Sequence, residues 1–266
     1  MSHSFAALAE QALTGAWNPL DFDFAADKQA WSNMPPPEQL LLRRLLAELH
    51  AGERSVASEL SPLAAALAKL GCRDAADFTA IHISEELRHE KFFATWFARV
   101  GISVDDVDLS EVPGGGPRIV DIIGQRFERL WNDHSLDALS QAVAVYHLAT
   151  EGISAVVLFR ILEDIVKQVP ELSALREALT LLRRDEARHV AAGQLLAESM
   201  ILQDGAFARK MTLDLRTLRG IAKGTSLFCF FPFHPGPIPF GLELGPYLKL
   251  AGDCLQMRTA ALQKVA

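Results

Sequence analysis

The sequence predicts an all-α protein, a four-helix bundle with additional flanking helices. Alternation of apolar and polar residues, typical of strands, is almost absent from the 266 residues, whereas apolar residues recur at helical spacing. Half of the residues are apolar, which is enough for one sizeable core. No shift in composition marks a boundary, so we expect a single domain over 1–266. The four central helices would fill about 38–202, and C-terminal helices with a loop rich in Phe and Pro would fill 203–266.

Proline and glycine place the ends of the expected helices. Pro35-Pro36-Pro37 would begin the first long helix, because proline suits first-turn positions, and we expect this helix to end near Leu60, before Pro62. The expected helices are 4–14, 35–60, 74–100, 118–132, 135–168, 171–202, 205–222 and 247–264. The expected loops are the stretch containing Trp17 and Trp31, the stretch 101–117 with its Gly-rich segment 113–117, and the stretch 224–246.

Composition excludes several classes of function. The net charge is −7 and the pI is near 5.6, with no basic tract, so nucleic acid is not an expected partner. Cys72, Cys229 and Cys254 are widely spaced, and neither a CxxC pair nor a signal-peptide pattern is present, so we expect reduced thiols in the cytoplasm. No apolar run reaches the length of a membrane-spanning helix, so no membrane association is expected.

One short motif occurs twice, 100 residues apart. Residues 85–89 read EELRH and residues 185–189 read DEARH, so each motif is acid-Glu-x-Arg-His. Glu and His three positions apart project from one face of a helix, where together they can hold a metal ion. A single such pair is most often part of a solvated face, but the repetition with the same Arg and the same preceding acid favours a metal site.

The register of the other long helices supports this interpretation. Glu53 continues the apolar stripe of the first long helix, and Glu151 continues that of the third. Glu48 and Glu59 are alternatives to Glu53, but one lies off the stripe and the other near the helix end. Buried carboxylates are unfavourable unless they are paired with positive charges or bound to cations. Two divalent ions bound between the helices would provide this positive charge. The expected metal ligands are Glu53, Glu86, His89, Glu151, Glu186 and His189.

These motifs resemble those of the ferritin-like superfamily, in particular its ribonucleotide reductase small-subunit branch. EExRH and DExRH are also similar to motifs of soluble acyl carrier protein desaturases and bacterial multicomponent monooxygenases. Within the branch, the chain most resembles the ligand-binding oxidases, which assemble a manganese/iron or di-iron site. The resemblance covers about 38–202. It implies a ferritin-like four-helix bundle and the six ligands given above.

The resemblance also implies partners for the ligand histidines. Asp185 would accept a hydrogen bond from the ring N–H of His89, and Glu85 would do the same for His189; such contacts fix the tautomer of the imidazole. Trp17 or Trp31 would extend this line to the surface as an electron path, or would be a packed aromatic residue.

Two positions depart from the pattern of relatives. Reductase subunits that store a tyrosyl radical place Tyr where Phe93 stands, so a radical-storing subunit is not expected. Tyr146 matches the Tyr that the ligand-binding oxidases carry five residues before the third-helix Glu, but Ser55 replaces its cross-link partner Val. Tyr146 is therefore a candidate catalytic residue at the pocket, cross-linked or not, or a core tyrosine with a satisfied hydroxyl.

Further residues near the motifs leave alternatives open. His82 and His147 each lie four positions before an expected ligand, and either is an extra ligand or a hydrogen-bonded core histidine. Aryl-amine N-oxygenases of the superfamily carry such a histidine before the last motif, where Leu182 stands here. Gly152 would let the third helix deform beside the metals, or would permit close packing. The Phe-rich stretch 228–235 would be a lid over an apolar pocket, or a cover on the bundle.

The expected function is oxidation of a small apolar or aromatic molecule by dioxygen at an Fe/Fe or Mn/Fe site, as in non-haem dimetal oxygenases and oxidases. Alternatives are a ferroxidase or iron-handling protein, and a non-catalytic binding module stabilised by metal. No flavin or iron–sulfur motif occurs, so electrons would come from a separate donor protein or from the substrate. We also expect a homodimer.

Overall fold

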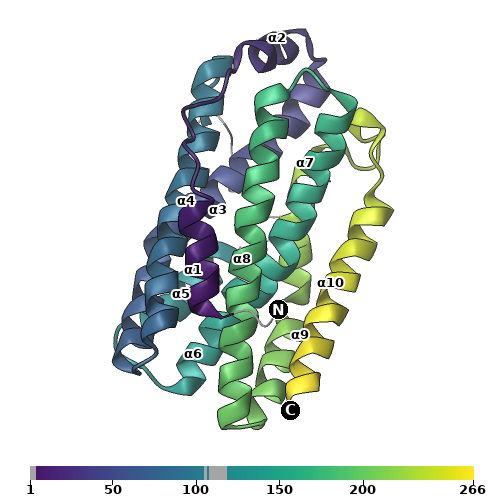
Figure 1. Cartoon of the computed structure of the whole chain (residues 1–266). Coiled ribbons are helices and arrows are strands. Elements are labelled where there is room, and N and C mark those ends of the chain that lie inside the picture. The colour runs from purple at the N-terminus through teal and green to yellow at the C-terminus, as the bar shows by residue number, and fades with distance from the viewer. Residues whose placement is uncertain (1–3, 105–106, 108–118) are drawn as a thin grey trace.

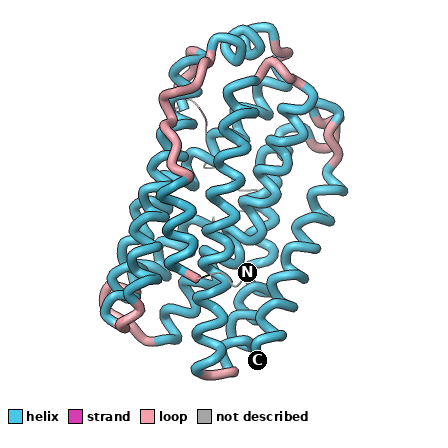
Figure 2. Tube along the Cα trace, in the orientation of Figure 1, coloured by secondary structure: helices cyan, strands magenta, loops and turns pink. Residues whose placement is uncertain are grey.

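The computed structural model describes residues 4–104, 107 and 119–266, and the regular secondary structure within these ranges is helical, with no strand. This confirms the predicted all-α fold (Figures 1 and 2). Four long helical segments run side by side along the long axis of the molecule, and α2 lies across one end. The long segments are α3 (Pro36–Lys69), α4 (Arg73–Val100), the continuous run α6–η2–α7 (Leu136–Val143, Ala144–Ala155 and Val156–Gln168) and α8 (Ser173–Gln203). The flanking elements are α1 (Phe5–Thr14), α2 (Ala25–Asn33), α5 (Ile119–Arg129), α9 (Ala206–Leu227), the 3-10 turns η3 (Phe228–Phe233) and η4 (Pro239–Gly241), and α10 (Leu244–Val265).

The core consists of two large apolar clusters and a small third one around Leu8, Phe78 and Ala192, and each long helical segment passes from one large cluster to the other. On α3, the residues between Leu41 and Leu49 belong to the first cluster and those from Val56 to Leu67 to the second. Glu53 lies between them, and the Glu and His residues of α4, η2 and α8 lie at the same boundary in their own helices. The bundle therefore brings its acidic residues to one level, enclosed by apolar layers on both sides.

The expected end of one helix is wrong and another helix forms where a loop was expected, because tertiary packing overrides local preference. Helix α3 continues through Pro62 to Lys69, since Leu63 and Leu67 keep burying its apolar face beyond the proline. Helix α2 forms inside an expected loop. Its Asp27 is completely buried and caps α8, accepting hydrogen bonds from the backbone N–H groups of Ala174 at 2.9 Å and Leu175 at 3.1 Å.

The third long segment winds as a π-helix over Ala144–Ala155, beside the predicted site. The Thr150 hydroxyl donates to the Val145 carbonyl at 2.8 Å, five residues back. A Cβ added to Gly152 would lie 2.9 Å from Arg258 Nε, so this glycine also allows α10 to approach closely. The close-packing expectation for Gly152 therefore holds, and the segment that contains it is deformed, while the role of the glycine in that deformation stays a prediction. Such π-helical segments occur frequently at functional sites.

The Phe-rich stretch after α9 covers the bundle. Phe228, Cys229 and Phe230 are all buried, and Cys229 and Phe230 belong to the first apolar cluster. The Arg44 guanidinium lies 4.1 Å from the centre of the Phe228 ring. None of these three residues lines the small cavity beside the predicted site, which favours the cover interpretation of this stretch over the lid interpretation. The Gly-rich segment 113–117 lies outside the described residues.

The expectation that no segment is long and apolar enough to span a membrane needs correction. The segment Leu136–Gln168 is long and apolar enough to cross a membrane, and its most apolar 18-residue window has a mean hydropathy of 1.6. However, 83% of its most apolar window is buried inside the protein, so it has the composition of a core helix surrounded by other helices.

Candidate metal centre

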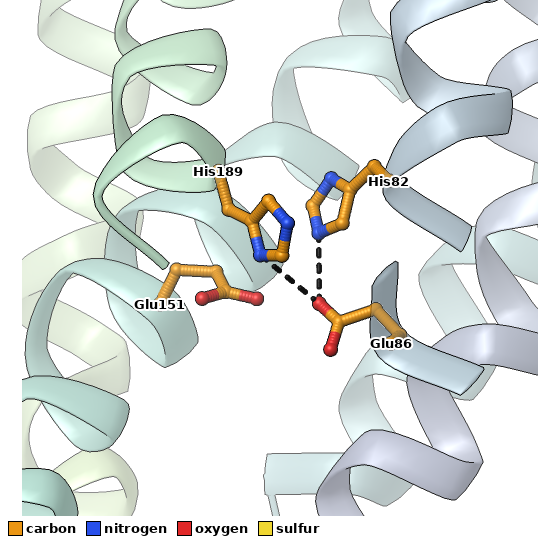
Figure 3. A group of neighbouring side chains, drawn as sticks. All are labelled: His82, Glu86, Glu151 and His189. Atoms are coloured by element: carbon orange, nitrogen blue, oxygen red, sulfur yellow. Dashed lines mark hydrogen bonds and ion pairs between the residues drawn. The ribbon is translucent and has the colours of Figure 1, made fainter. Parts of the chain in front are cut away.

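The structure brings the six predicted ligands together in two overlapping groups, all of them buried. Within each group, the candidate ligand atoms lie within 4.8 Å of one another. The groups share Glu86. The first comprises His82, Glu86, Glu151 and His189, whose side chains converge in Figure 3, and the second comprises Glu53, Glu86, His89 and Glu186.

The distances place the carboxylates of the two motifs between the two histidines. His89 Nδ1 lies 3.4 Å from Glu86 Oε2 and 3.3 Å from Glu186 Oε1. His189 Nδ1 lies 3.3 Å from Glu86 Oε1 and 3.8 Å from Glu186 Oε2. Glu86 therefore presents one oxygen to each imidazole and could serve two ions, whereas Glu186 lies nearer to His89 than to His189.

The buried atoms that lack a hydrogen bond show that the site fits metal ions. Nδ1 of His89, Nδ1 of His189, one oxygen of Glu86 and one oxygen of Glu151 make no hydrogen bond, although all are buried. Leaving such groups unpaired costs about 1–3 kcal/mol each. These atoms face the centre of the two groups, so divalent cations would satisfy them together.

Both predicted hydrogen bonds to the ligand histidines are present. His89 Nε2 lies 3.2 Å from Asp185 Oδ2, and His189 Nε2 lies 3.1 Å from Glu85 Oε2. When Nε2 donates to these carboxylates, the lone pair is on Nδ1, the nitrogen that faces the Glu side chains. The acids preceding each motif therefore select the tautomer that can bind a metal.

Burial and close packing of the ligand side chains shift their pKa values. Burial, together with the charge of Glu86, raises the pKa of Glu53 well above its ordinary value. Burial and the charge of Glu186 raise the pKa of Glu151 in the same way. Burial alone would lower the pKa of His89 and of His189, but the surrounding carboxylates raise both well above the ordinary range. Without metal, Glu53 and Glu151 would therefore be neutral acids, and the positive charges of His89 and His189 would balance the two remaining carboxylates. We call Glu53, His89, Glu151 and His189 the proton-holding ligands.

Two arginines and a tryptophan complete the surroundings, and sequence reasoning gave the arginines no role. Arg188 Nη2 donates to Asp185 Oδ1 at 2.5 Å and also to Glu85. Arg88 lies 3.6 Å from Asp185 and 3.9 Å from Glu85. The repetition of Arg in both motifs was the available signal. Trp17 Nε1 donates to Asp185 Oδ2 at 2.8 Å, so Trp17 rather than Trp31 extends the line from His89.

Tyr146 and His82 meet at Glu86. The Tyr146 hydroxyl donates to Glu86 Oε1 at 2.9 Å and lies 3.0 Å from His82 Nε2. Burial, followed by the charge of Glu151, raises the pKa of Tyr146 well above its ordinary value, so its hydroxyl keeps its proton. The structure therefore places Tyr146 directly on a predicted metal ligand, with its hydroxyl satisfied.

The remaining candidates do not join either group. His147 packs against α8 where Gly193 leaves space, since a Cβ on Gly193 would lie 2.2 Å from His147 Cβ. Neither alternative to Glu53 belongs to a donor group. Glu59 accepts a hydrogen bond from the Ser55 hydroxyl at 3.1 Å, and Glu48 lines the adjacent cavity.

A small cavity of about 60 Å³ adjoins the site. Three of the predicted ligands, Glu53, Glu151 and Glu186, form one wall. The apolar residues lining the cavity are Leu49, Val56, Ile119, Val120, Ala155, Leu158 and Phe159. The volume is enough for roughly four water molecules at about 15 Å³ each.

Comparison with known proteins places the fold. No protein-family model matches the chain. An R2-like ligand-binding oxidase from Sulfolobus acidocaldarius superposes with a TM-score of 0.85 at 22% identity, covering 100% of this chain and 92% of that one. An R2-like ligand-binding oxidase with an aerobically reconstituted Mn/Fe cofactor gives a TM-score of 0.87 at 22% identity, covering 97% and 92%. The chain thus has the ferritin-like fold of the oxidases that its motifs resemble.

Proposed function

We propose that this protein is a dimetal carboxylate oxidase or oxygenase that uses dioxygen to oxidise a small apolar or aromatic molecule. The observation that carries the proposal is the pair of overlapping donor groups sharing Glu86 at the wall of a mostly apolar cavity. Solved structures of the same fold carry Mn/Fe cofactors, which supports Mn/Fe as the metal pair here, with Fe/Fe as the alternative from the sequence. When bound, the two metals would supply the electrons and the Lewis acidity for reaction with dioxygen.

The residues of the chain would bind the metal ions and shield the reaction site from water. The six ligands would be Glu53, Glu86, His89, Glu151, Glu186 and His189, with Asp185 and Glu85 orienting the histidines. The apolar layers above and below the site would keep bulk water out. Tyr146 would hold Glu86 in place through its hydroxyl and retain its proton there.

Electrons would enter along a line of contacts from the surface. Trp17 is partly exposed, and it contacts the carboxylate oxygen of Asp185 that also accepts from His89. A separate donor protein docking near Trp17 would deliver electrons to the ion held by His89. The homodimer, the cytoplasmic location and the absence of nucleic-acid or membrane partners remain proposals from the sequence.

The substrate would enter the cavity beside Glu53, Glu151 and Glu186. Because its volume is only about 60 Å³, the cavity suits a small molecule or the end of a longer apolar one. Its apolar lining favours a hydrocarbon or aromatic group over a charged one.

The test is to load the protein with ferrous iron, add dioxygen and follow absorbance and oxygen consumption with and without aromatic or aliphatic compounds. An oxidase would consume oxygen and modify a compound without accumulating mineral. A growing ferric core would indicate a ferroxidase instead, and absence of oxygen consumption would indicate a binding module.

A further inference from the structure

His82 occupies a ligand position within the first donor group. Its Nε2 lies 2.8 Å from Glu86 Oε1, the same oxygen that lies 3.3 Å from His189 Nδ1. Neighbouring ligands bound to one ion at about 2.1 Å are roughly 3 Å apart when their bonds are perpendicular. The spacing of these nitrogens from the shared oxygen is therefore that of atoms around one ion (Figure 3).

The packing of His82 fixes this orientation. Its ring stacks on the His189 ring with centroids 3.5 Å apart and an angle of 21° between the planes. The residue is 1% exposed. Two nearly parallel imidazoles from α4 and α8 thus face the same carboxylate, and His147, although close by, belongs to neither donor group.

We propose that His82 is a seventh ligand, binding through Nε2 to the ion held by Glu151 and His189. This inference rests on the proposed dimetal function and refines it. The two ions would then have different surroundings, two imidazoles with Glu86 and Glu151 on one side, and one imidazole with three carboxylates on the other. Imidazole suits iron, whereas carboxylate suits manganese, so the His82 side takes iron first and the Glu53 side accepts manganese more readily.

The test counts imidazoles around iron in the full-length protein. Metal-free protein receives one equivalent of ferrous iron without oxygen, and X-ray absorption at the iron edge measures imidazole scattering. We expect two imidazoles per iron in the wild type, one in His82→Gln, and two in the matched control His147→Gln. One imidazole in the wild type, or an unchanged count in His82→Gln, would overturn the assignment and leave His82 as a hydrogen-bond partner of Glu86 and Tyr146.

A competition experiment supplies an independent measurement. With iron and manganese offered together, His82→Gln should lose most of the iron preference of the wild type, with iron affinity falling up to ~100-fold, the upper end of effects seen around metal ligands. The wild-type preference persisting in His82→Gln would contradict the inference. If the wild type binds fewer than two metals, the proposed function fails as well, so the two failures are distinguishable. Circular dichroism of the variants checks their folding.

Discussion

Asp185 is the most connected acid around the site, so its amide replacement is the sharpest test of the arrangement. Oδ2 accepts from Trp17 Nε1 at 2.8 Å and from His89 Nε2 at 3.2 Å. Oδ1 accepts from Arg188 at 2.5 Å and from Arg184 at 3.2 Å. Asp185→Asn keeps the shape but turns one of these acceptor oxygens into an NH₂ donor.

The loss of stability in Asp185→Asn follows from the hydrogen-bond donors that lose their acceptor oxygen. If the amide oxygen stays with His89, the NH₂ group faces the two guanidinium groups, and hydrogen bonds to charged groups are worth about 1.5–3 kcal/mol each. Arg188 retains Glu85 as a partner, so we expect a loss of on the order of 3 kcal/mol in the free energy of unfolding. The weaker orientation of His89 should lower metal affinity at its ion by about 10–100-fold.

The assay combines denaturant unfolding of the metal-free protein with chelator competition for iron. Asp133→Asn is the matched control, because it removes the same charge at a partly exposed carboxylate far from the ligands, which bonds Arg129 and Ser135. Wild-type metal affinity and oxygen kinetics in Asp185→Asn would refute the reasoning and reduce Asp185 to a structural acid.

Three further predictions concern protons, space and the tyrosine. The proton-holding ligands have pKa values in the folded protein above their ordinary values of 4.5 for Glu and 6.5 for His. Their protonation therefore stabilises the metal-free fold fully at a pH below the ordinary pKa values. This stabilisation is lost as the pH rises through the raised pKa values. Because metals must displace these protons, chelator competition should show metal affinity rising with pH and proton release on binding; a pH-independent affinity would contradict this. Gly193→Ala places a Cβ against His147, so denaturant unfolding should show a loss of ~1–3 kcal/mol, whereas Gly220→Ala, with open space around it, should not destabilise. Tyr146→Phe removes the hydroxyl from Glu86 but no predicted ligand, so elemental analysis should still find two metals per chain while oxygen reactivity changes; loss of one metal would show that Tyr146 is needed for binding.

The long helices could be predicted because their signal is local. Apolar residues recur every three or four positions, and this spacing selected Glu53 over Glu48 and Glu59 before any contact was known. Helix α2 could not be found in this way, since Asp27 stabilises it by capping a helix 147 residues further along the chain. The continuation of α3 past Pro62 has the same origin, because burial beyond the proline offsets its local cost.

The contacts around the site also join residues far apart in the sequence, so they could not be predicted from local spacing. They account for the balance of charges at the site as well. Spacing within one motif places Glu and His on one face, but it cannot reveal that Arg188 reaches across to Glu85, 103 residues away. The arginine repeated in the two motifs has a clear electrostatic role once that contact is known. Arg88 and Arg188 balance the two outer acids, Asp185 and Glu85, so these carboxylates need no metal. Four inner glutamates then remain, and their charge equals that of two divalent ions, which is why the donor geometry and the charge balance lead to the same metal content.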